Sequence, residues 1–365
     1  MAFGHSRRDF LRFTLTSGAA AVVAAHWARS ARAVAPTRPA TMPGTMPARG
    51  PRPVQVLPAV AAARVALTTG EDRADIAFQA LKTFEKEITA AIGNKRIILK
   101  PNNVNGRNPV ACSDPKNLEG CLEFLKSIGK IGNVVMAESG VSIPKALDSF
   151  AALGYNPLAD KYGIKFLDLD DEGFEILPVF DQTDMRPRPV RFSKLLLDPS
   201  VFIISAAKLK THDRAVATLS LKNIVFAAPV KTGGFNDKAI LHGSGVYGTN
   251  FNLAAMAPRL HPHLALIDGY QGMEGNGPGG GQAVEHRVCV ASLDWLAADR
   301  VGIELMGIDP AKVGYLNYCS QNGMGQYDLS KIEVLGAAVK DHIKQYKLHD
   351  SVQQQYQWMT QPKLS

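Results

Sequence analysis

Short apolar runs of strand-like composition alternate with longer segments of helical periodicity between residues 63 and 337. Strands are predicted at 63–70, 95–103, 132–140, 164–170, 201–207, 260–270, 285–294 and 331–336. Helices are predicted at 74–93, 113–129, 142–155 and 295–308. This order predicts an α/β fold with a mainly parallel or mixed open sheet and helices on both faces. The alternation is compatible with one domain or with two closely packed lobes.

The first 62 residues are predicted to lie outside this fold. Ser6-Arg7-Arg8-Asp9-Phe10-Leu11 matches the twin-arginine export pattern, and an apolar run and the cleavage-type sequence Ala31-Arg32-Ala33 follow it. Residues 1–33 are therefore interpreted as a signal peptide, with an uncleaved N-terminal anchor as the alternative. Residues 34–62 are rich in proline, which predicts a semi-extended tether. Residues 338–365 are interpreted as a peripheral helix and tail.

The predicted signal peptide indicates the cellular location of the mature protein and one expected partner. The expected location is periplasmic or secreted, the expected partner is the twin-arginine translocation machinery, and no stable membrane span is expected after cleavage. The formal net charge of +8 includes a surplus of four from residues 1–33, which leaves +4 for the rest of the chain. With no basic stripe in addition, a nucleic-acid partner is not expected.

The chain has four cysteines, at positions 112, 121, 289 and 319, and no C-x-x-C spacing. An iron–sulfur cluster or a structural zinc site is therefore not expected. Cys112 and Cys121 lie nine positions apart, and either a disulfide between them or two free thiols is compatible with export.

The stretch Gly275-Asn276-Gly277-Pro278-Gly279-Gly280 fits the spacing G-x-G-x-x-G, which is typical of dinucleotide-binding loops. Such a loop needs a helix after it, because the helix N-terminus faces the pyrophosphate. The residues that follow alternate and are rich in β-branched side chains, which predicts a strand. Binding of NAD or FAD at this loop is therefore not expected. The loop is interpreted as a connection that either passes close to a ligand or is a purely structural turn.

Polar side chains cluster where several predicted strands end. In a parallel open sheet, ligands bind outside the carboxyl ends of the strands, so these side chains are expected to share one cleft. A lysine within an apolar run, as at Lys222, is costly to bury unless it is paired or binds an anion, or else it reaches the surface. The residues of the predicted cleft are Lys100, Asn102, Asn103, Glu138, Ser139, Lys208, Lys210, His212, Lys222, Asn223, Asp268 and Glu274.

Two chemistries fit this set. In the first, Lys100, Lys210 and His212 are catalytic: the lysines hold an anion, and His212 or a lysine moves a proton. Its ligand-binding residues are Asn102, Asn103, Ser139, Lys208, Lys222, Asn223, Gly275 and Gly277. In the second, a divalent metal is held by Glu138, Asp268 and Glu274, with His212 as a further candidate ligand. His261 and His263 also form an H-x-H pair, but no third ligand is spaced to join them.

Five ordered blocks resemble the domain-of-unknown-function 362 family over residues 64–337. They are "ILKPNN", "AESG", "KLKTHDRAVATLSLKNIVF", "IDGYQGMEGNGPGGG" and "SLDWLAADRVGIELMGIDP". One departure is Asp294-Trp295, where the family pattern has aspartate followed by proline, although Asp299 is kept. The resemblance implies a fold and the location of a site, but it does not indicate which reaction the site catalyses. Added cysteine clusters of some members are absent from this sequence, so electron transfer through such a cluster is not implied.

The sequence thus supports two functional hypotheses. The first is an exported enzyme that acts on a small anionic substrate, with a metal or another cofactor as an open alternative. The second is a non-catalytic periplasmic binding protein for an anionic ligand or a metal.

Overall fold

A nine-stranded mixed sheet forms the centre of the protein. The computed structural model describes residues 61–104, 106, 108–140 and 145–359. The strands of the sheet are β1 (Ala63–Thr69), β2 (Arg96–Pro101), β3 (Val134–Glu138), β4 (Lys165–Asp168), β7 (Val201–Thr211), β8 (Ala217–Thr218), β11 (Leu264–Glu274), β12 (Gln282–Ser292) and β13 (Ile332–Gly336).

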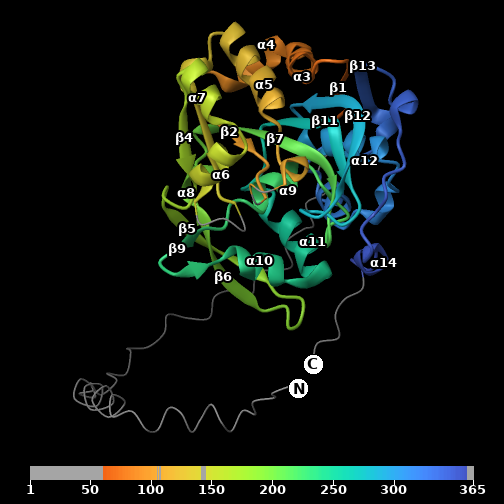
Figure 1. The fold of residues 1–365 in the computed structure, drawn as a ribbon. Helices are drawn as coiled ribbons and strands as arrows, with labels where there is room; N and C mark the ends of the chain where they lie inside the picture. The colour runs from red at the N-terminus through yellow and green to blue at the C-terminus, as the bar shows by residue number, and fades with distance from the viewer. Residues whose placement is uncertain (1–60, 105, 107, 141–144, 360–365) are drawn as a thin grey trace, which may run out of the picture. The chain divides into compact units, whose positions relative to one another are not determined.

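Most neighbouring strands in this sheet are parallel. The order is β13-β1-β12-β11-β7-β2-β3-β4, and β8 pairs with β7 outside this path (Figure 1). Strand β12 runs antiparallel to β1 and β11, and β8 runs antiparallel to β7. The predicted α/β fold with a mixed, mainly parallel open sheet is confirmed. All described residues fall within one compact unit, which favours one domain over two lobes. The predicted signal peptide and most of the predicted tether lie outside the described residues.

Helices cover both faces of the sheet. One face packs against α3 (Arg73–Lys82), α4 (Glu85–Ile92), α5 (Pro115–Ser127), α6 (Ala146–Ala152) and α7 (Asn156–Tyr162). The other face packs against α8 (Lys194–Leu197), α9 (Ser220–Val225), α10 (Lys238–Gly243), α11 (Gly245–Met256), α12 (Trp295–Leu305) and α13 (Gly314–Gln321).

Strand β7 shows how the sequence specifies a central position in the sheet. All eleven of its residues are buried, because helices cover the strand on both sides. Val201 and Ile203 belong to the apolar cluster that also contains residues of α12, whereas Phe202 and Ile204 belong to the cluster that contains residues of α3. A strand buried on both faces has a continuous apolar run instead of an alternating pattern. The run "VFIISAA" therefore predicted this strand correctly.

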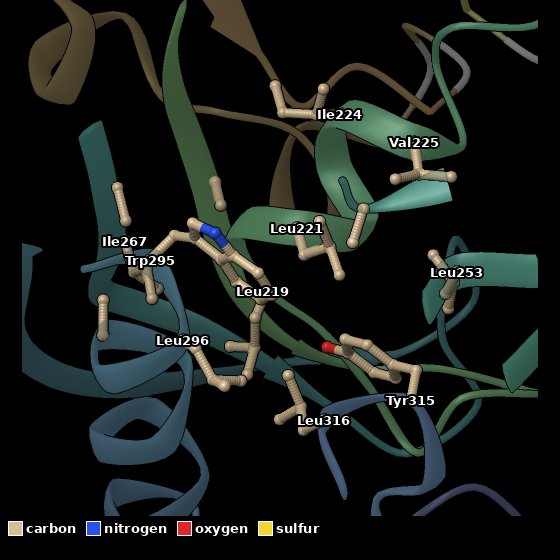
Figure 2. Packing of buried hydrophobic residues seen from close by; sticks show 14 of the residues in the cluster. Leu219, Leu221, Ile224, Val225, Leu253, Ile267, Trp295, Leu296, Tyr315 and Leu316 are labelled. Atoms are coloured by element: carbon tan, nitrogen blue, oxygen red, sulfur yellow. The ribbon is translucent and has the colours of Figure 1, made fainter. Parts of the chain in front are cut away.

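Helix α9 is short, and packing holds it in place. Figure 2 shows apolar side chains of α9 and its flanks in contact with residues of α11, β11, α12 and α13, all of which belong to one buried cluster. The labelled members are Leu219, Leu221, Ile224, Val225, Leu253, Ile267, Trp295, Leu296, Tyr315 and Leu316. Helices of six residues are not stable alone, so tertiary contacts fix this one.

Two predicted helices are divided in the structure. The helix predicted at 74–93 is α3 followed by α4, because Thr83 bonds back to the Gln79 carbonyl and Phe84 turns into the core. The helix predicted at 142–155 ends earlier, at Ala152, and α7 begins at Asn156. Gly154 separates these two helices with a φ of +75°, a conformation that favours glycine.

Several elements were not predicted. Two small hairpins, β5–β6 (Phe174–Phe180 and Pro187–Ser193) and β9–β10 (Lys231–Thr232 and Phe235–Asn236), lie outside the main sheet. The strands of the β5–β6 hairpin contain prolines at positions 178, 187 and 189, which cannot donate to a neighbouring strand. Strands β5 and β6 pair only with each other among the described residues, so both are edge strands, which tolerate proline.

The C-terminal segment is less peripheral than the sequence suggested. Its described helices are the short 3-10 helix Val339–His342 and α14 (Val352–Gln355). Tyr346 and Trp358 are nevertheless buried against the domain. Gln355, which is 1% exposed, accepts a hydrogen bond from the Val216 amide at 2.7 Å. This contact ties the C-terminal segment to the loop that follows β7.

Candidate functional site

A narrow polar pocket opens at the carboxyl ends of β2, β3 and β7. Its empty volume is about 420 Å³. The lining residues are Lys100, Asn102, Asn103, Val104, Glu138, Ser139, Lys210, His212, Thr218, Lys222, Asn223, Phe226, Ala227, His242 and Pro278. The structure therefore brings together most of the predicted cleft.

The sheet topology explains why residues from distant parts of the chain meet here. Strands β3, β2 and β7 are parallel neighbours, so their carboxyl ends lie at one edge. Lys100 is near the end of β2, Glu138 ends β3, and Lys210 is near the end of β7.

Helix α9 brings Lys222 and Asn223 to the same edge. The buried carboxylate of Asp299 on α12 accepts hydrogen bonds from the Ser220 amide at 2.8 Å and the Leu221 amide at 3.3 Å. Burial raises the pKa of Asp299 to about 7. These contacts occupy free amide groups of the first helical turn and fix its orientation.

Asn223 and Glu138 hold the Lys100 ammonium. Lys100 Nζ lies 2.7 Å from Glu138 Oε2 and donates to Asn223 Oδ1 at 2.8 Å and to the Pro101 carbonyl at 2.5 Å. The three donors of this ammonium therefore each have an acceptor. Burial lowers the pKa of Lys100, and the charge of Glu138 opposes that shift. Glu138 also accepts from the Asn103 amide at 3.0 Å.

Two other lysines of the pocket have no carboxylate partner among the described residues. Lys210 Nζ donates to the Ala111 carbonyl at 2.6 Å. Lys222 Nζ lies 4.2 Å from the centroid of the Phe226 ring and donates no hydrogen bond to a described residue. Burial lowers the pKa of each lysine to about 7. The charge of Lys210 adds to the shift of Lys222, and the charges of Lys208 and Lys100 add to the shift of Lys210. The pocket therefore carries more cationic groups than its single lining carboxylate balances.

Two histidines lie beside these lysines. His212 Nδ1 is 3.0 Å from Asp213 Oδ1 and 3.1 Å from the Arg214 amide nitrogen. The Arg214 amide donates a hydrogen bond to Nδ1, so in the neutral ring the proton lies on Nε2. His242 Nδ1 lies 2.7 Å from the Lys238 carbonyl, so this nitrogen is a donor. Burial lowers the pKa of both histidines to about 3, and the charge of Lys222 contributes.

Two polar atoms of lining residues have no hydrogen-bond partner among the residues that the structure describes. They are Asn102 Oδ1 and Thr218 Oγ1, and both residues are at least nine-tenths buried. Buried polar atoms are normally bonded to protein, water or a ligand. The pocket thus offers bonding capacity that the described part of the chain does not use.

The glycine loop is the turn of a β-hairpin. It joins the antiparallel strands β11 and β12, so the strand predicted after the loop is confirmed. Gly277 lies against β7: a Cβ atom at this position would be 2.0 Å from the Thr211 carbonyl oxygen. Pro278 lines the pocket, and its carbonyl accepts from Lys210 Nζ at 3.3 Å. Gly275 has a φ of +79° and does not line the pocket.

Besides Gly275 and Gly277, three predicted site residues lie away from the pocket lining. Lys208 Nζ is 3.1 Å from Asp268 Oδ2, and Arg73 Nε is 3.5 Å from Asp268 Oδ1. Glu274 accepts a hydrogen bond from the Lys347 amide at 2.9 Å. Glu138, Asp268 and Glu274 therefore do not converge as the metal hypothesis required. The described residues contain no group of three or more His, Cys, Asp or Glu side chains that could hold a metal ion.

The other candidate pairs also have structural partners. His261 and His263 have ring centroids 5.6 Å apart, and His263 Nδ1 accepts from the Ile203 amide at 3.0 Å. Cys112 and Cys121 are free buried thiols, which decides between the two alternatives left open for them.

Sequence reasoning missed four residues that shape the site. His242, Thr218 and Phe226 line the pocket, and Gln355 holds the loop beside His212. None of these residues follows a strong predicted strand, so no sequence pattern indicated that they would lie at the pocket. Asp299 was noted as a kept block residue, but its role beneath α9 was not foreseen.

Comparison with known proteins places this site in a family context. Residues 97–304 match the model described as "Domain of unknown function (DUF362)". The chain belongs to the DUF362 family. The match spans β2 to α12 and so contains every strand end and helix that lines the pocket.

Two further similarities are more distant. A thylakoid-associated protein of Synechocystis sp. is 27% identical over 230 residues, which cover 60% of this chain and 65% of the relative. The chain therefore spans just under two thirds of that relative's length. A crystal structure of a Thermotoga maritima protein aligns with a TM-score of 0.34 at 12% identity, covering 56% of this chain and 52% of that one. Over the described ranges, this DUF362 protein has no helix of the length and apolarity that a membrane crossing needs.

Proposed function

We propose that this DUF362 protein is an exported enzyme that acts on a small anionic substrate in the pocket. One observation carries the proposal. Lys210 and Lys222 are both buried in this pocket, the charge of Lys210 acts on Lys222, and neither lysine has a carboxylate partner among the described residues. Two such cations are costly to bury unless an anion joins them. A carboxylate or phosphate oxygen would supply the missing acceptors.

Neutral polar groups support the same ligand. Asn102 contributes an amide and Thr218 a hydroxyl, and each has an atom without a partner. The hydroxyl of Thr218 can donate to an anion, whereas Asn102 Oδ1 needs a donor from the substrate. This combination fits an anion that also carries a hydroxyl or amine group.

A proton-transfer role for the histidines supports catalysis over binding alone. His212 and His242 stay neutral at physiological pH because burial lowers their pKa. Neither Nε2 atom has a hydrogen-bond partner within the described ranges. His242 carries its proton on Nδ1, so its free Nε2 can accept a proton from a bound substrate. His212 accepts a hydrogen bond at Nδ1, so its Nε2–H can donate one to the same substrate.

Anion binding can be tested by thermal unfolding of the full-length protein. Inorganic phosphate, acetate and citrate at millimolar concentration should each be compared with chloride at equal ionic strength. At least one should raise the melting temperature of the wild type by mass action, and Lys210→Met should remove that response. Lys86→Met is the matched control, because Lys86 is an exposed lysine of α4 that does not line the pocket. Equal responses in both variants would contradict the proposal.

Turnover can be tested by NMR on mixtures of small carboxylates and phosphomonoesters. The wild type should consume a component, and His212→Ala and Lys210→Ala should abolish consumption with little change in melting temperature. Stabilisation by an anion without consumption of any component would instead support the alternative, a non-catalytic binding protein.

Export is proposed from Arg7 and Arg8 together with the cleavage-type sequence that ends at Ala33. It implies a periplasmic or secreted mature protein and contact with the twin-arginine translocation machinery. Substitution of both arginines by lysine should leave the full-length precursor in the cytoplasm. Unchanged export of that double variant would exclude this route.

A further inference from the structure

The buried lysines of the pocket region differ in how many acceptors surround each ammonium. Lys100 has three acceptors, Lys210 has two carbonyl oxygens, and Lys238 has the Ala227 carbonyl at 2.5 Å. Lys222 has none among the described residues. An ammonium group has three protons to donate. Lys222 donates none of them to a described residue, so it loses fewer hydrogen bonds than the other lysines when it becomes a neutral amine.

The surroundings of Lys222 also disfavour a positive charge. Its amine lies over the Phe226 ring, and the His242 ring meets the same phenyl group with centroids 4.5 Å apart. His212 approaches Phe226 from another side at 6.5 Å. The charged and titratable groups that act on Lys222 are Lys100, Lys210, His212, Asp213, Arg214 and His242. Asp213 is the one anion in this set, and it is paired with His212.

Because the pKa of Lys222 is lowered to about 7, a large fraction of this side chain is neutral at pH 7.5 and the rest is the cation that an anion would meet. A neutral lysine amine beside other cations is the arrangement that forms imines with carbonyl compounds. We propose that Lys222 is a nucleophile that forms an imine with an anionic carbonyl compound, such as a 2-oxo acid, in this pocket. The proposal rests on the proposed function and narrows its substrate class. Lys210 and Thr218 are placed to hold the anionic group of such a substrate while its carbonyl carbon meets Lys222.

The step is balanced without an external oxidant or reductant. The lone pair of Lys222 Nζ attacks the carbonyl carbon, and the carbonyl oxygen takes up a proton to give a carbinolamine. The C–O bond then breaks, water leaves, and a C=N bond forms. His242 lines the same pocket and its Nδ1 donates to the Lys238 carbonyl, so its Nε2 can take the proton released from nitrogen and pass it to the leaving hydroxyl. Hydrolysis reverses the sequence and regenerates the amine.

Reductive trapping with glyoxylate tests the proposal. Glyoxylate is a small anionic aldehyde, and sodium cyanoborohydride reduces its imine to a stable carboxymethyl-lysine. The full-length protein is treated briefly at pH 7.5 and mapped by peptide mass spectrometry. Lys222 should be labelled about tenfold faster than the exposed residues Lys86 and Lys165, because ordinary lysines are almost fully protonated at this pH.

Lys222→Arg is the matched variant, since arginine keeps a cation and removes the nucleophile. It should lose the fast label while labelling of Lys86 and Lys165 stays unchanged. Inorganic phosphate should slow labelling of Lys222 in the wild type and leave the exposed lysines unaffected. Labelling of Lys222 at or below the rate of Lys86, or fast labelling of Lys210 in its place, would overturn the proposal.

The outcome separates this inference from the proposed function. If phosphate or another anion still raises the melting temperature while Lys222 is not preferentially labelled, the anion site stands and the imine chemistry fails. If neither effect occurs, both proposals fail together.

Discussion

Two polar clusters at the strand ends of this protein both contain buried lysines and at least one carboxylate, and they differ in charge balance. In the first, Lys208 and Arg73 contact Asp268, and Arg73 also pairs with Asp114, so two cations meet two carboxylates. In the second, the pocket, Lys100, Lys210 and Lys222 face one lining carboxylate, Glu138. Lys208 and Asp268 are as fully buried as the pocket lysines, so these two residues differ from the pocket lysines in pairing and not in exposure.

This difference separates a structural network from a site prepared for a ligand. A buried ion pair whose charges balance does not require a ligand, although removing only one of its two partners lowers the stability of the protein. A buried cluster with surplus charge reduces the stability of the free protein and regains that free energy when an anion binds. Variants that change the balance in each cluster should therefore act in opposite directions on stability.

The largest effect is expected from Asp268→Leu. This change leaves Lys208 and Arg73 buried near each other without their shared carboxylate, so it should lower the free energy of unfolding by about 3–5 kcal/mol. Urea unfolding of the full-length protein measures the change. The double variant Lys208→Met/Asp268→Leu should recover much of the loss. A single variant as stable as the wild type would show that this cluster is not a paired network.

Lys222→Met should have the opposite sign. It replaces an unpartnered buried lysine with an apolar side chain of similar length, so the free energy of unfolding should rise by about 1–2 kcal/mol. The same variant should respond less to phosphate than the wild type in thermal unfolding. A loss of stability at Lys222 would mean that its charge is balanced in the free protein.

The pH dependence of stability tests the histidines of the pocket. His212 has its pKa lowered to about 3 in the folded protein, whereas an unfolded histidine titrates near its ordinary value of about 6.5. The unfolded state therefore binds more protons between these two values, and stability falls as the pH drops from about 6.5 to 3. Between pH 7 and pH 5 this one residue should contribute a loss of about 1–2 kcal/mol.

Comparison of wild type and His212→Asn by urea unfolding at pH 7 and pH 5 isolates that contribution. The variant should lose less stability on acidification, and His242 should account for part of the loss that remains. Equal losses in the two proteins would show that His212 is protonated in the folded state.

The smallest expected change in stability comes from Asp299→Asn. Asparagine keeps an acceptor but removes the charge that orients the first turn of α9, which should cost about 1 kcal/mol. Because α9 carries Lys222, the anion-dependent rise in melting temperature should shrink by more than this loss explains. Ser127→Ala, which removes a surface hydroxyl far from the pocket lining, is the control and should leave that rise intact.

The strand ends could be predicted from the sequence because each lies in continuous chain. Lys100, Glu138 and Lys210 each follow an apolar run, and the rule for parallel sheets puts such residues on one edge. Asp268 follows an equally clear strand, yet its side chain pairs with Lys208 and Arg73 outside the pocket lining. Sequence position alone could not distinguish these outcomes, because it fixes which end of the strand a residue occupies and not which partners meet it there.

What the sequence by itself determined is the alternation of strands and helices, the mixed and mainly parallel sheet, and the edge at which polar residues gather. These properties follow from local periodicity and from the burial of apolar runs. The tertiary structure alone decided that His242, Thr218 and Phe226 join the pocket, and that Glu274 does not. It also decided which lysines are paired. Charge balance depends on contacts between residues far apart in the chain, and these exist only after the helices have packed on the sheet.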